Sequence, residues 1–459
     1  MTYTDTIFAL SSASGKAGLA VIRVSGAQAQ NVFQKMIPIP VPLANFMQYT
    51  CFYDPETQDT LDFGLCVFFA APKSFTGEDC VEFHIHGGLA TLQSMLLALG
   101  KIPNFRLAEA GEFSKRGFLN GKFDLTQAES LIDLIDAETE HQRRAALSHT
   151  RGALHQLYQD WWYRLSEIRA YTEACLDFPD EEIPDDLEDH ICTYCETLRT
   201  EIAQHHETAP KGERLRLGTK IAIIGPSNAG KSSLMNYLAQ TQAAITSPIA
   251  GTTRDSIELH IDIAGYPVKL IDTAGVQETT DPIEQEGIKR ARQHAEQADL
   301  ILIMFDGSQP ILEYDEFIQL AHKKPCIIIS NKSDQAFNAG NNNIITKLPQ
   351  SLLHISLIEN SGLTELHETI AKNLEKLAGG SHAPIIMHAR YQQALHSTLK
   401  ALDRVDSLIE IAQKSNTSAD LVLIAEELRI GLNHIAQIIG KVDVEDLLEI
   451  IFSRFCIGK

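Results

Sequence analysis

The residues best suited to chemistry in this chain of 459 residues form the segment Gly225-Pro-Ser-Asn-Ala-Gly-Lys-Ser-Ser233, directly after an apolar run. Their spacing is that of a P-loop. Gly225 and Gly230 let the backbone curl so that successive N–H groups point inward, and the following helix adds its N-terminal dipole. Lys231 can then reach the outer phosphates, and the Ser232 hydroxyl can hold a bridging magnesium ion. The segment predicts a nucleotide site.

Three further motifs follow in the order of a GTPase. Asp272-Thr-Ala-Gly275 ends a predicted strand, where the aspartate can act on magnesium through a water and the Gly275 N–H can sense a γ-phosphate. Gly251-Thr-Thr-Arg-Asp255 lies in the preceding loop, where Thr253 can complete the magnesium shell. Asn331-Lys-Ser-Asp334 follows another strand, and its carboxylate can accept from N1 and the exocyclic amine of guanine. Adenine offers no such pair of donors, so the motifs predict GTP as the nucleotide.

Two positions depart from the usual GTPase pattern. Ser356 follows the expected strand, but Leu357 and Ile358 replace the usual Ala-Lys that contacts the ribose and base edge. Val276 stands where a water-orienting glutamine commonly follows the Asp-x-x-Gly motif, and an apolar side chain cannot orient water. Spacing does not choose among the remaining candidates, each of which is otherwise an exposed polar or charged residue on a loop: Gln277, Glu278, Asp281, Glu284 and Glu286.

The elements that position these motifs form an α/β pattern inside a helical one. Four apolar runs alternate with helical stretches and predict a mainly parallel sheet flanked by helices: Val268 to Ile271, Leu300 to Phe305, Cys326 to Ile329 and Leu352 to Ile355. Helical periodicity precedes this segment, as in Leu125 to Ile135, and returns after it from Tyr391 to Ile411 and from Ala419 to Ile439. The nucleotide-binding segment is therefore interpreted as an insertion into a helical domain.

The first part of the chain has an α+β pattern. Strands are predicted at Leu19 to Val24, Leu65 to Phe69 and Cys80 to Ile85, with an amphipathic helix from Leu89 to Leu99. Polar residues interrupt these runs, among them His84 and His86, which share one face of a strand. Because no third ligand is identifiable nearby, we interpret them as packed or hydrogen-bonded histidines and not as a metal site.

Length and composition predict several domains. We expect an α+β domain at 1–120, the first part of a helical domain at 121–217, the nucleotide-binding domain at 218–379 and the second helical part at 380–459. The formal charge of −21 argues against a broad basic surface, so any contact with nucleic acid must be local or shared with a partner. No leader or membrane-spanning run is recognisable, and a cytoplasmic protein without a membrane partner is expected.

The eight cysteines are scattered, as is typical of reduced thiols. Cys192 and Cys195 form a Cys-x-x-Cys pair within a helical pattern, and we assign them no metal or redox role. Cys456 lies four residues from the end, but Gly458 and Lys459 do not fit a prenylation signal. A packing role and a chemical role remain open for Cys456.

Several further motifs lie outside the nucleotide-binding segment: Ser74-Phe-Thr-Gly-Glu-Asp79, His86-Gly-Gly88, Gly111-Glu-Phe113, Phe118-Leu-Asn-Gly-Lys-Phe-Asp-Leu-Thr-Gln-Ala-Glu129, Asp177-Phe-Pro179, Glu426-Glu-Leu428 and Ile451-Phe-Ser-Arg-Phe-Cys-Ile-Gly-Lys459. With these motifs, the chain resembles the tRNA-modification GTPase family MnmE (TrmE) over almost its whole length. It departs from the family pattern where Ala110 replaces the usual proline before Gly111, and where Ser12-Ala-Ser-Gly-Lys-Ala-Gly18 varies a Thr-Pro-Pro-Gly-Arg-Gly-Gly loop.

The resemblance implies a homodimer built through the N-terminal domain, which binds a one-carbon donor, 5,10-methylene- or 5-formyl-tetrahydrofolate. It places folate contacts on Arg23, Glu82, Lys122 and the terminal Lys459. These residue types suit folate, since its glutamyl tail attracts cations and its pterin attracts a carboxylate. The family acts with an FAD-containing partner, MnmG (GidA), in a heterotetramer. Together they add an aminomethyl or carboxymethylaminomethyl group at C5 of the wobble uridine in certain tRNAs.

For the GTPase, the resemblance implies a potassium ion held by Asn228, Ser247, Ile249 and Thr252, with magnesium on Ser232 and Thr253. It assigns water positioning to Glu284, with Lys231 as the second catalytic residue. The other expected nucleotide contacts are Ala229, Gly230, Ser233, Pro248, Ala250, Gly251, Asp272, Thr273, Ala274, Gly275, Asn331, Lys332 and Asp334.

A second class of function is a regulatory or ribosome-assembly GTPase with no direct part in modification chemistry. Such a protein usually carries a basic RNA-binding domain after the sheet. This chain instead carries an acidic helical region that ends in Phe455-Cys-Ile-Gly-Lys459. The sequence therefore favours the modification enzyme.

Overall fold

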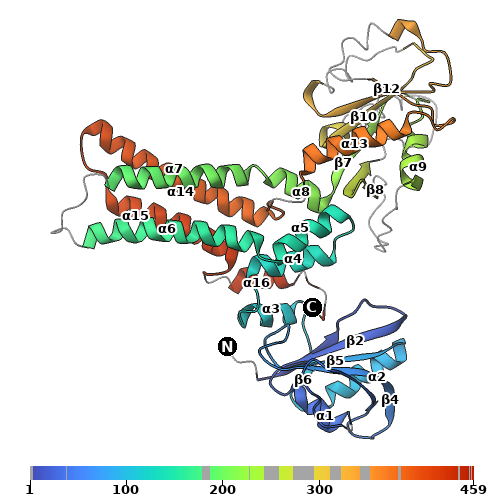
Figure 1. Cartoon of the computed structure of the whole chain (residues 1–459), viewed down its shortest axis with the longest axis vertical. Helices are drawn as coiled ribbons and strands as arrows, with labels where there is room; N and C mark the ends of the chain where they lie inside the picture. Colours follow the sequence, from blue (N-terminus) through green and yellow to red (C-terminus); the bar gives the residue numbers. More distant parts are fainter. Residues whose placement is uncertain are drawn as a thin grey trace, which may run out of the picture. The chain divides into compact units, whose positions relative to one another are not determined.

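The computed structural model divides the chain into two compact units, Met1–Ile132 with Ala436–Lys459, and Asp133–Ile435 (Figure 1). Each unit is built around one six-stranded sheet. The residues described are 4–37, 39–177, 187–226, 228–241, 258–271, 294–310, 322–341, 352–380, 384–442, 445–453, 455 and 457–458.

The sheet of the first unit has the strand order β3-β4-β5-β2-β1-β6. Neighbouring strands are antiparallel except for the parallel pair β1 and β6. The three strands predicted in this region are confirmed, whereas β1, β3 and β6 were not predicted. The strands are β1 Thr6–Leu10, β2 Ala17–Ser25, β3 Met47–Tyr53, β4 Thr60–Phe69, β5 Cys80–Gly87 and β6 Phe105–Leu107.

The two faces of this sheet differ. On one face, Ile22, Val24 and Phe83 pack in a core with α1, Val32–Lys35, and the predicted helix α2, Leu89–Gly100. A short 3₁₀ turn, Ala29–Asn31, precedes α1. Because side chains of a strand alternate, Arg23 of β2 and Glu82 of β5 point to the opposite face. That face also carries several large apolar side chains that are about half exposed or more: Leu19, Met47, Tyr49 and Phe63.

The end of the chain returns to the first unit. Leu448, Ile451 and Phe452 of α16, Glu445–Phe452, pack against Leu125 and Ala128 at the start of α4, Leu125–Ile135. Helix α3, Glu112–Leu119, begins after Gly111, which has a φ of +68°. A Cβ at Gly111 would overlap the backbone of Phe452, so this close approach requires glycine.

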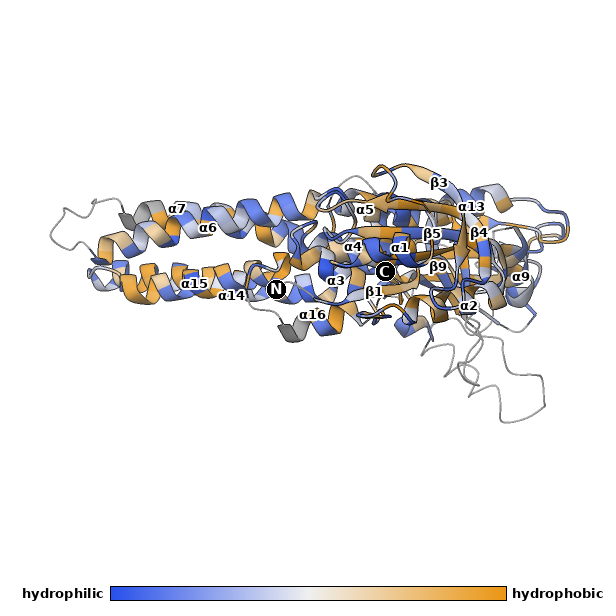
Figure 2. Cartoon of the chain, turned by 90° about the horizontal axis from the view of Figure 1, so that it is seen from below, coloured by the Kyte–Doolittle hydropathy of each residue, from blue (hydrophilic) through white to orange (hydrophobic). Residues whose placement is uncertain are grey.

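The second unit contains long amphipathic helices, as the periodicity predicted. In α14 the buried residues Leu395, Leu402, Val405 and Ile409 recur at helical spacing. Figure 2 shows hydrophilic and hydrophobic residues alternating along α6, α7, α14 and α15. Among the described residues, no helix has the length and apolar character that crossing a membrane requires. The helices are α5 Glu140–Thr150, α6 Ala153–Asp177, α7 Leu187–His206, α8 Ala209–Leu217, α14 Ala389–Ser415 and α15 Leu421–Ile439.

The sheet of the second unit has the order β12-β11-β10-β7-β9-β8 and is parallel except for the β8–β9 hairpin. Its central strands are buried on both faces, as in a sheet covered by helices on each side. The mainly parallel sheet is confirmed, but β8 was not predicted. The strands are β7 Thr219–Ile224, β8 Glu258–Ile263, β9 Tyr266–Ile271, β10 Leu300–Asp306, β11 Cys326–Asn331 and β12 Leu352–His354, accompanied by helices α9 Lys231–Thr241 and α13 Leu363–Ala378 and the 3₁₀ turn Ala339–Asn341.

One buried carboxylate contacts both segments that connect the helices to this sheet, the one that enters the sheet and the one that leaves it. Asp133 Oδ1 lies 2.9 Å from Nε of Arg216, which precedes β7. Asp133 Oδ2 lies 2.8 Å from Nε2 of His388, which precedes α14. The inserted segment is therefore anchored at its entry and at its exit by the same side chain.

Candidate functional site

The P-loop between β7 and α9 is curled for a steric reason. Gly225 has a φ of +150°, and a Cβ there would overlap the carbonyl oxygen of Met304 in β10. Gly230 has a φ of +101°, and a Cβ there would collide with the Asn331 side chain. Asn228 is an exposed residue with a φ of +61° at the tip of the loop. Glycine at positions 225 and 230 therefore allows the loop to pass this close to β10 and to Asn331.

Lys231 lies across the mouth of the loop. Its Nζ donates to the carbonyl oxygens of Gly225, at 2.9 Å, and Pro226, at 2.8 Å. Ser232 and Ser233 are exposed in the first turn of α9, where the helix presents its free N–H groups. A cation, hydroxyls and a helix N-terminus in one place fit an anionic phosphate chain and its magnesium ion.

The predicted guanine-binding residues lie beside the P-loop. Asn331 is buried, and its Nδ2 donates to the Ala229 carbonyl oxygen at 2.9 Å. Its Oδ1 is buried and has no hydrogen-bond partner among the residues that the structure describes. Asp334 is exposed, and one carboxylate oxygen accepts a 2.6 Å hydrogen bond from the buried Ser356 hydroxyl. The P-loop follows β7 and the predicted guanine motif follows β11, the two strands that flank β10, so the parallel sheet brings both to the same edge.

Ser356 is fixed from several sides. It exchanges backbone hydrogen bonds with Ser361, at 3.0 and 3.1 Å, and its hydroxyl accepts from the Glu359 N–H at 3.1 Å. Leu357 is half-buried against the core of the sheet, whereas Ile358 is 79% exposed. The fifth motif therefore keeps the serine that orients Asp334, while the departure from Ala-Lys places one apolar side chain inward and one in solvent.

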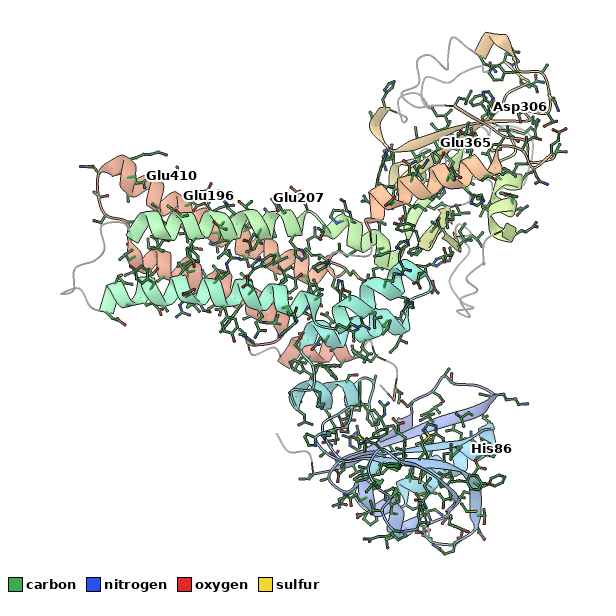
Figure 3. The ribbon with its side chains drawn as sticks, viewed as in Figure 1. His86, Glu196, Glu207, Asp306, Glu365 and Glu410 are labelled. Atoms are coloured by element: carbon green, nitrogen blue, oxygen red, sulfur yellow. The ribbon has the colours of Figure 1, made fainter. Side chains whose placement is uncertain are left out.

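One residue of this site was missed in the sequence. Asp306 ends β10, and its Oδ2 accepts from Nζ of Lys332 at 2.6 Å (Figure 3). The other oxygen accepts from the Ser308 N–H and hydroxyl. Burial acts to raise the pKa of Asp306, but the bonds from Lys332 and Ser308 outweigh it and hold that pKa below its usual value. The sequence could have indicated Asp306, because an aspartate that directly follows an apolar strand lies at the same sheet edge as the other motifs.

In the first unit, Arg23 and Glu82 face each other on neighbouring strands. Nε of Arg23 lies 2.9 Å from Oε1 of Glu82. The guanidinium lies over the rings of Phe75, 4.9 Å from the centroid, and Phe113, at 5.8 Å. An ion pair beside an aromatic surface suits a planar ligand that carries carboxylates.

The neighbouring polar residues are oriented in different ways. Nε2 of His84 is buried and lies 3.7 Å from Oε2 of Glu82, and within the described part of the chain it has no hydrogen-bond partner. His86, labelled in Figure 3, is bound through Nδ1 to Oδ1 of the buried Asp62 at 2.8 Å. Lys122 is exposed and donates to the Pro72 carbonyl oxygen. The structure thus pairs Arg23 with Glu82 but gives Lys122 a separate partner.

A buried arginine binds acidic residues from two of the motifs that carried the resemblance. Arg116 is fully buried, and its Nη2 lies 2.9 Å from carboxylate oxygens of both Asp5 and Glu112. Its Nη1 lies 3.3 Å from Glu78. Glu78 belongs to the Ser74–Asp79 motif and Glu112 to the Gly111–Phe113 motif. The network therefore holds together the two segments that supply Phe75 and Phe113 to Arg23.

The described histidines, cysteines and acidic residues include no group of three that could hold a metal ion. Burial raises the pKa of the Cys195 thiol to about 12, which makes this thiol unreactive at neutral pH. Several predicted site residues, together with Cys456, lie outside the part of the chain that the structure describes: Ser247, Pro248, Ile249, Ala250, Gly251, Thr252, Thr253, Asp272, Thr273, Ala274, Gly275, Glu284 and Lys459.

The fold and the site together define the class of the protein as a P-loop GTPase. Family profiles described as "GTP-binding protein TrmE N-terminus" and "MnmE helical domain" match residues 6–122 and 125–456. The tRNA modification GTPase MnmE of Parvibaculum lavamentivorans is 44% identical over 99% of this chain and 100% of its own length. The mitochondrial 5-taurinomethyluridine-[tRNA] synthase subunit GTPB3 of Danio rerio is 41% identical over 99% of this chain and 93% of its own length.

Among solved structures, a crystal structure of an Era variant from Aquifex aeolicus, bound to GDP and aluminium fluoride, is 31% identical. It covers 40% of this chain and 66% of its own, with a TM-score of 0.27. The full-length relatives establish the family: the chain belongs to the tRNA modification GTPases of the MnmE family. The protein is accordingly a GTP hydrolase of tRNA modification, with GTP as its substrate.

Proposed function

We propose that this GTPase, together with an FAD-containing MnmG partner, forms aminomethyl or carboxymethylaminomethyl groups at C5 of the wobble uridine in certain tRNAs. The observation that carries the proposal is the match to tRNA modification enzymes over almost the full length of both chains. The name of the Danio rerio relative specifies a uridine substituted at C5. The two proteins act as a heterotetramer in the cytoplasm.

The one-carbon unit comes from 5,10-methylene- or 5-formyl-tetrahydrofolate bound in the N-terminal domain. Glu82 accepts from the N–H groups of the pterin, while Arg23, Lys122 and the terminal Lys459 attract the glutamyl carboxylates. The unpartnered Nε2 of His84 beside Glu82 and the ring of Phe75 beside Arg23 fit a polar, planar heterocycle. The bound folate supplies the carbon atom that is transferred.

A homodimer covers the open face of the N-terminal sheet. Leu19, Met47, Tyr49 and Phe63 lie on that face and are about half exposed or more, which is unusual for several large apolar side chains on neighbouring strands. A second copy of the same face would bury them symmetrically. We place the domain limits at 1–120, 121–217, 218–379 and 380–459.

Hydrolysis depends on potassium. Asn228 and the loop of Ser247, Ile249 and Thr252 hold the ion, while Ser232 and Thr253 hold magnesium. Asn228 fits this role because its side chain is exposed at the tip of the P-loop. The ion supplies positive charge beside the β- and γ-phosphates, where other GTPases use an arginine. Glu284 aligns the attacking water in place of the missing glutamine, and Lys231 binds the phosphates.

Replacing sodium by potassium at constant ionic strength tests this proposal. The steady-state rate of GTP hydrolysis should rise at least about tenfold, because the extra charge acts mainly in the transition state. Asn228→Ala should remove the potassium response. Glu284→Ala should abolish most turnover with little change in GTP affinity, whereas the matched control Glu365→Ala, an exposed glutamate of α13, should behave as the wild type.

Equal rates in sodium and potassium would refute the cation mechanism. If the Glu284→Ala enzyme were fully active, the potassium mechanism would still stand. Water positioning would then be assigned to Gln277 or to one of the neighbouring acidic residues.

A further inference from the structure

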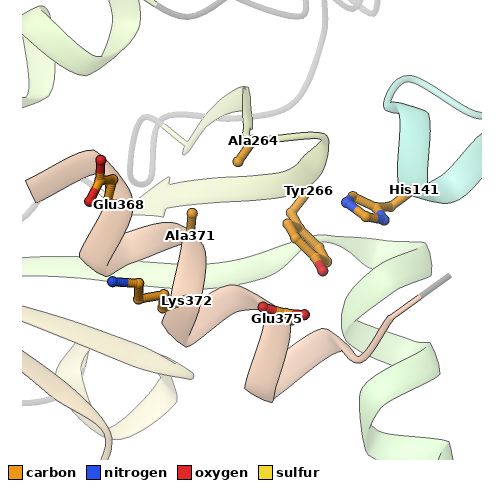
Figure 4. Close-up of a pocket in the computed structure, with 7 residues that line it drawn as sticks. All are labelled: His141, Ala264, Tyr266, Glu368, Ala371, Lys372 and Glu375. Carbon is orange, nitrogen blue, oxygen red and sulfur yellow. The ribbon is translucent and has the colours of Figure 1, made fainter. Parts of the chain in front are cut away.

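The turn of the β8–β9 hairpin rests on the first turn of α5. The ring of His141 stacks on the ring of Tyr266, with centroids 4.0 Å apart and an interplanar angle of 17° (Figure 4). The backbone N–H of His141 donates to the Gly265 carbonyl oxygen at 3.1 Å. Gly265 has a φ of +84°, and a Cβ there would lie 2.9 Å from Cδ2 of His141. The turn and the helix are therefore fitted closely to each other.

Both sides of this contact are fixed by their own surroundings. On the hairpin, Asp262 accepts from the Gly265 N–H at 2.7 Å, and the Tyr266 hydroxyl lies 3.3 Å from the Gly379 carbonyl oxygen. On the helix, Oε1 of Gln142 accepts from the Thr139 N–H at 3.0 Å, and its Nε2 donates to the Arg216 carbonyl oxygen at 3.1 Å. A movement of either side would therefore act on the other.

The other end of the hairpin leads directly to the two motifs next to the phosphates. β8 begins at Glu258, shortly after the Gly251–Asp255 motif, and β9 ends at Ile271, directly before Asp272. The strands pair along their whole length, from Glu258 with Ile271 to Ile263 with Tyr266. Six residues of strand span about 20 Å. Backbone pairing thus extends from the His141 contact to Glu258 and Ile271, the described residues nearest in sequence to the two motifs.

The stack depends on two uncharged rings. Burial, with a smaller contribution from the charge of Arg144, holds the pKa of His141 below its usual value, so the imidazole is neutral at pH 7. A pocket of about 400 Å³ borders the rings and is lined on its other side by Glu368, Lys372 and Glu375 of α13 (Figure 4).

We propose that His141 is a positioning residue for GTP hydrolysis, acting through Tyr266 and the β8–β9 ribbon on the two phosphate-side motifs. The inference rests on the proposed roles of the Gly251–Asp255 and Asp272–Gly275 motifs. Catalytic groups must be held within a fraction of an ångström, so a fixed point at one end of a paired ribbon restricts the groups at the other. The helical region thereby influences the rate of hydrolysis.

The test compares His141→Leu, Tyr266→Leu, their double variant and His141→Phe in the full-length protein. Leucine keeps apolar volume but removes the stack, so kcat for GTP should fall about fivefold with KM within about twofold of the wild type. The double variant should be no slower than the slower single variant, because the two rings act as one unit. His141→Phe keeps a neutral aromatic ring at this position and should keep kcat within about twofold of the wild type.

Each variant is assayed below its own melting temperature, so that a loss of stability alone does not lower kcat. Unchanged kcat in His141→Leu, or multiplied losses in the double variant, would overturn the inference. Asp334→Asn is measured in parallel. If it loses guanine selectivity while His141→Leu keeps its kcat, the nucleotide site stands and only the role of His141 fails; if selectivity stays, the proposed site itself is wrong.

Discussion

At the scale of single residues, the proposed selection of guanine rests on Asp334 and on the serine that orients it. The buried Ser356 hydroxyl donates to one carboxylate oxygen of Asp334, and Asp334 itself is exposed. A carboxylate only accepts hydrogen bonds, so it matches the two N–H donors on the guanine edge and rejects a ring that presents a carbonyl there. Ser356 fixes the orientation without contributing selectivity of its own.

Asp334→Asn should reverse that preference. The amide can donate to the extra carbonyl of xanthine, so the affinity for GTP should fall by about 1–3 kcal/mol while xanthosine triphosphate binds better. Calorimetric titration with both nucleotides measures the change. Asp160→Asn, at an exposed aspartate of α6, is the matched control. An unchanged affinity for GTP would count against the guanine assignment.

Sequence reasoning could predict residues of a nucleotide site because their spacing is local. The P-loop from Gly225 to Ser233 and the Asn331–Asp334 motif are each continuous in the chain. The ion pair of Asp306 with Lys332 joins residues 26 positions apart, and the bonds from Arg116 to Asp5 join residues 111 positions apart. No periodicity reports such contacts, since they form only when the sheet is assembled.

At the scale of elements, the same distinction separates the predicted strands from the missed ones. The strands β10 and β11 are buried on both faces and are continuous apolar runs. By contrast, β3 lies at a sheet edge with its first three residues exposed, and β6 has only three residues, paired with β1 about a hundred positions earlier. Short or exposed edge strands lack the apolar pattern on which prediction depends. The long helices were predicted because their periodicity extends over many turns, whereas the short helices α1 and α3 were not predicted.

Buried histidines tie the stability of the helical elements to pH. His149 of α5 is buried, and His205 of α7 accepts or donates a 2.9 Å hydrogen bond with the Tyr158 hydroxyl. Burial lowers the pKa of each imidazole to about 4. Because the folded-state value lies below the unfolded one, protons bind the unfolded chain first. Stability is therefore complete above about pH 6.5 and is lost as pH falls toward about 4.

His149→Leu should flatten this pH dependence. Removing one such histidine should reduce the slope of the free energy of unfolding by up to about 1.4 kcal/mol per pH unit between about pH 4.5 and pH 6. Denaturant titrations at several pH values give the slope. The exposed His322→Leu should leave it unchanged. If both variants keep the wild-type slope, the imidazole of His149 is not the group that is neutral in the folded protein.

At the scale of the whole molecule, one chain carries two separate chemical sites. The GTPase sheet is inserted between α8 and α14 and is anchored on both crossings by Asp133. The Arg23 and Glu82 pair lies in the other unit, to which the end of the chain also returns. With a formal charge of −21, the protein has no broad attraction for RNA, so its contact with tRNA must be local or shared with a partner.

The most direct test of this account is mass analysis of the wobble uridines in tRNA from cells that lack the protein. Those uridines should lack the aminomethyl or carboxymethylaminomethyl group, and the wild-type chain should restore it. Neither Asp334→Asn nor Arg23→Ala should restore it, whereas the exposed Lys35→Ala of α1 should do so fully. Normally modified uridines in the deletion strain would contradict the account and favour a regulatory or ribosome-assembly GTPase.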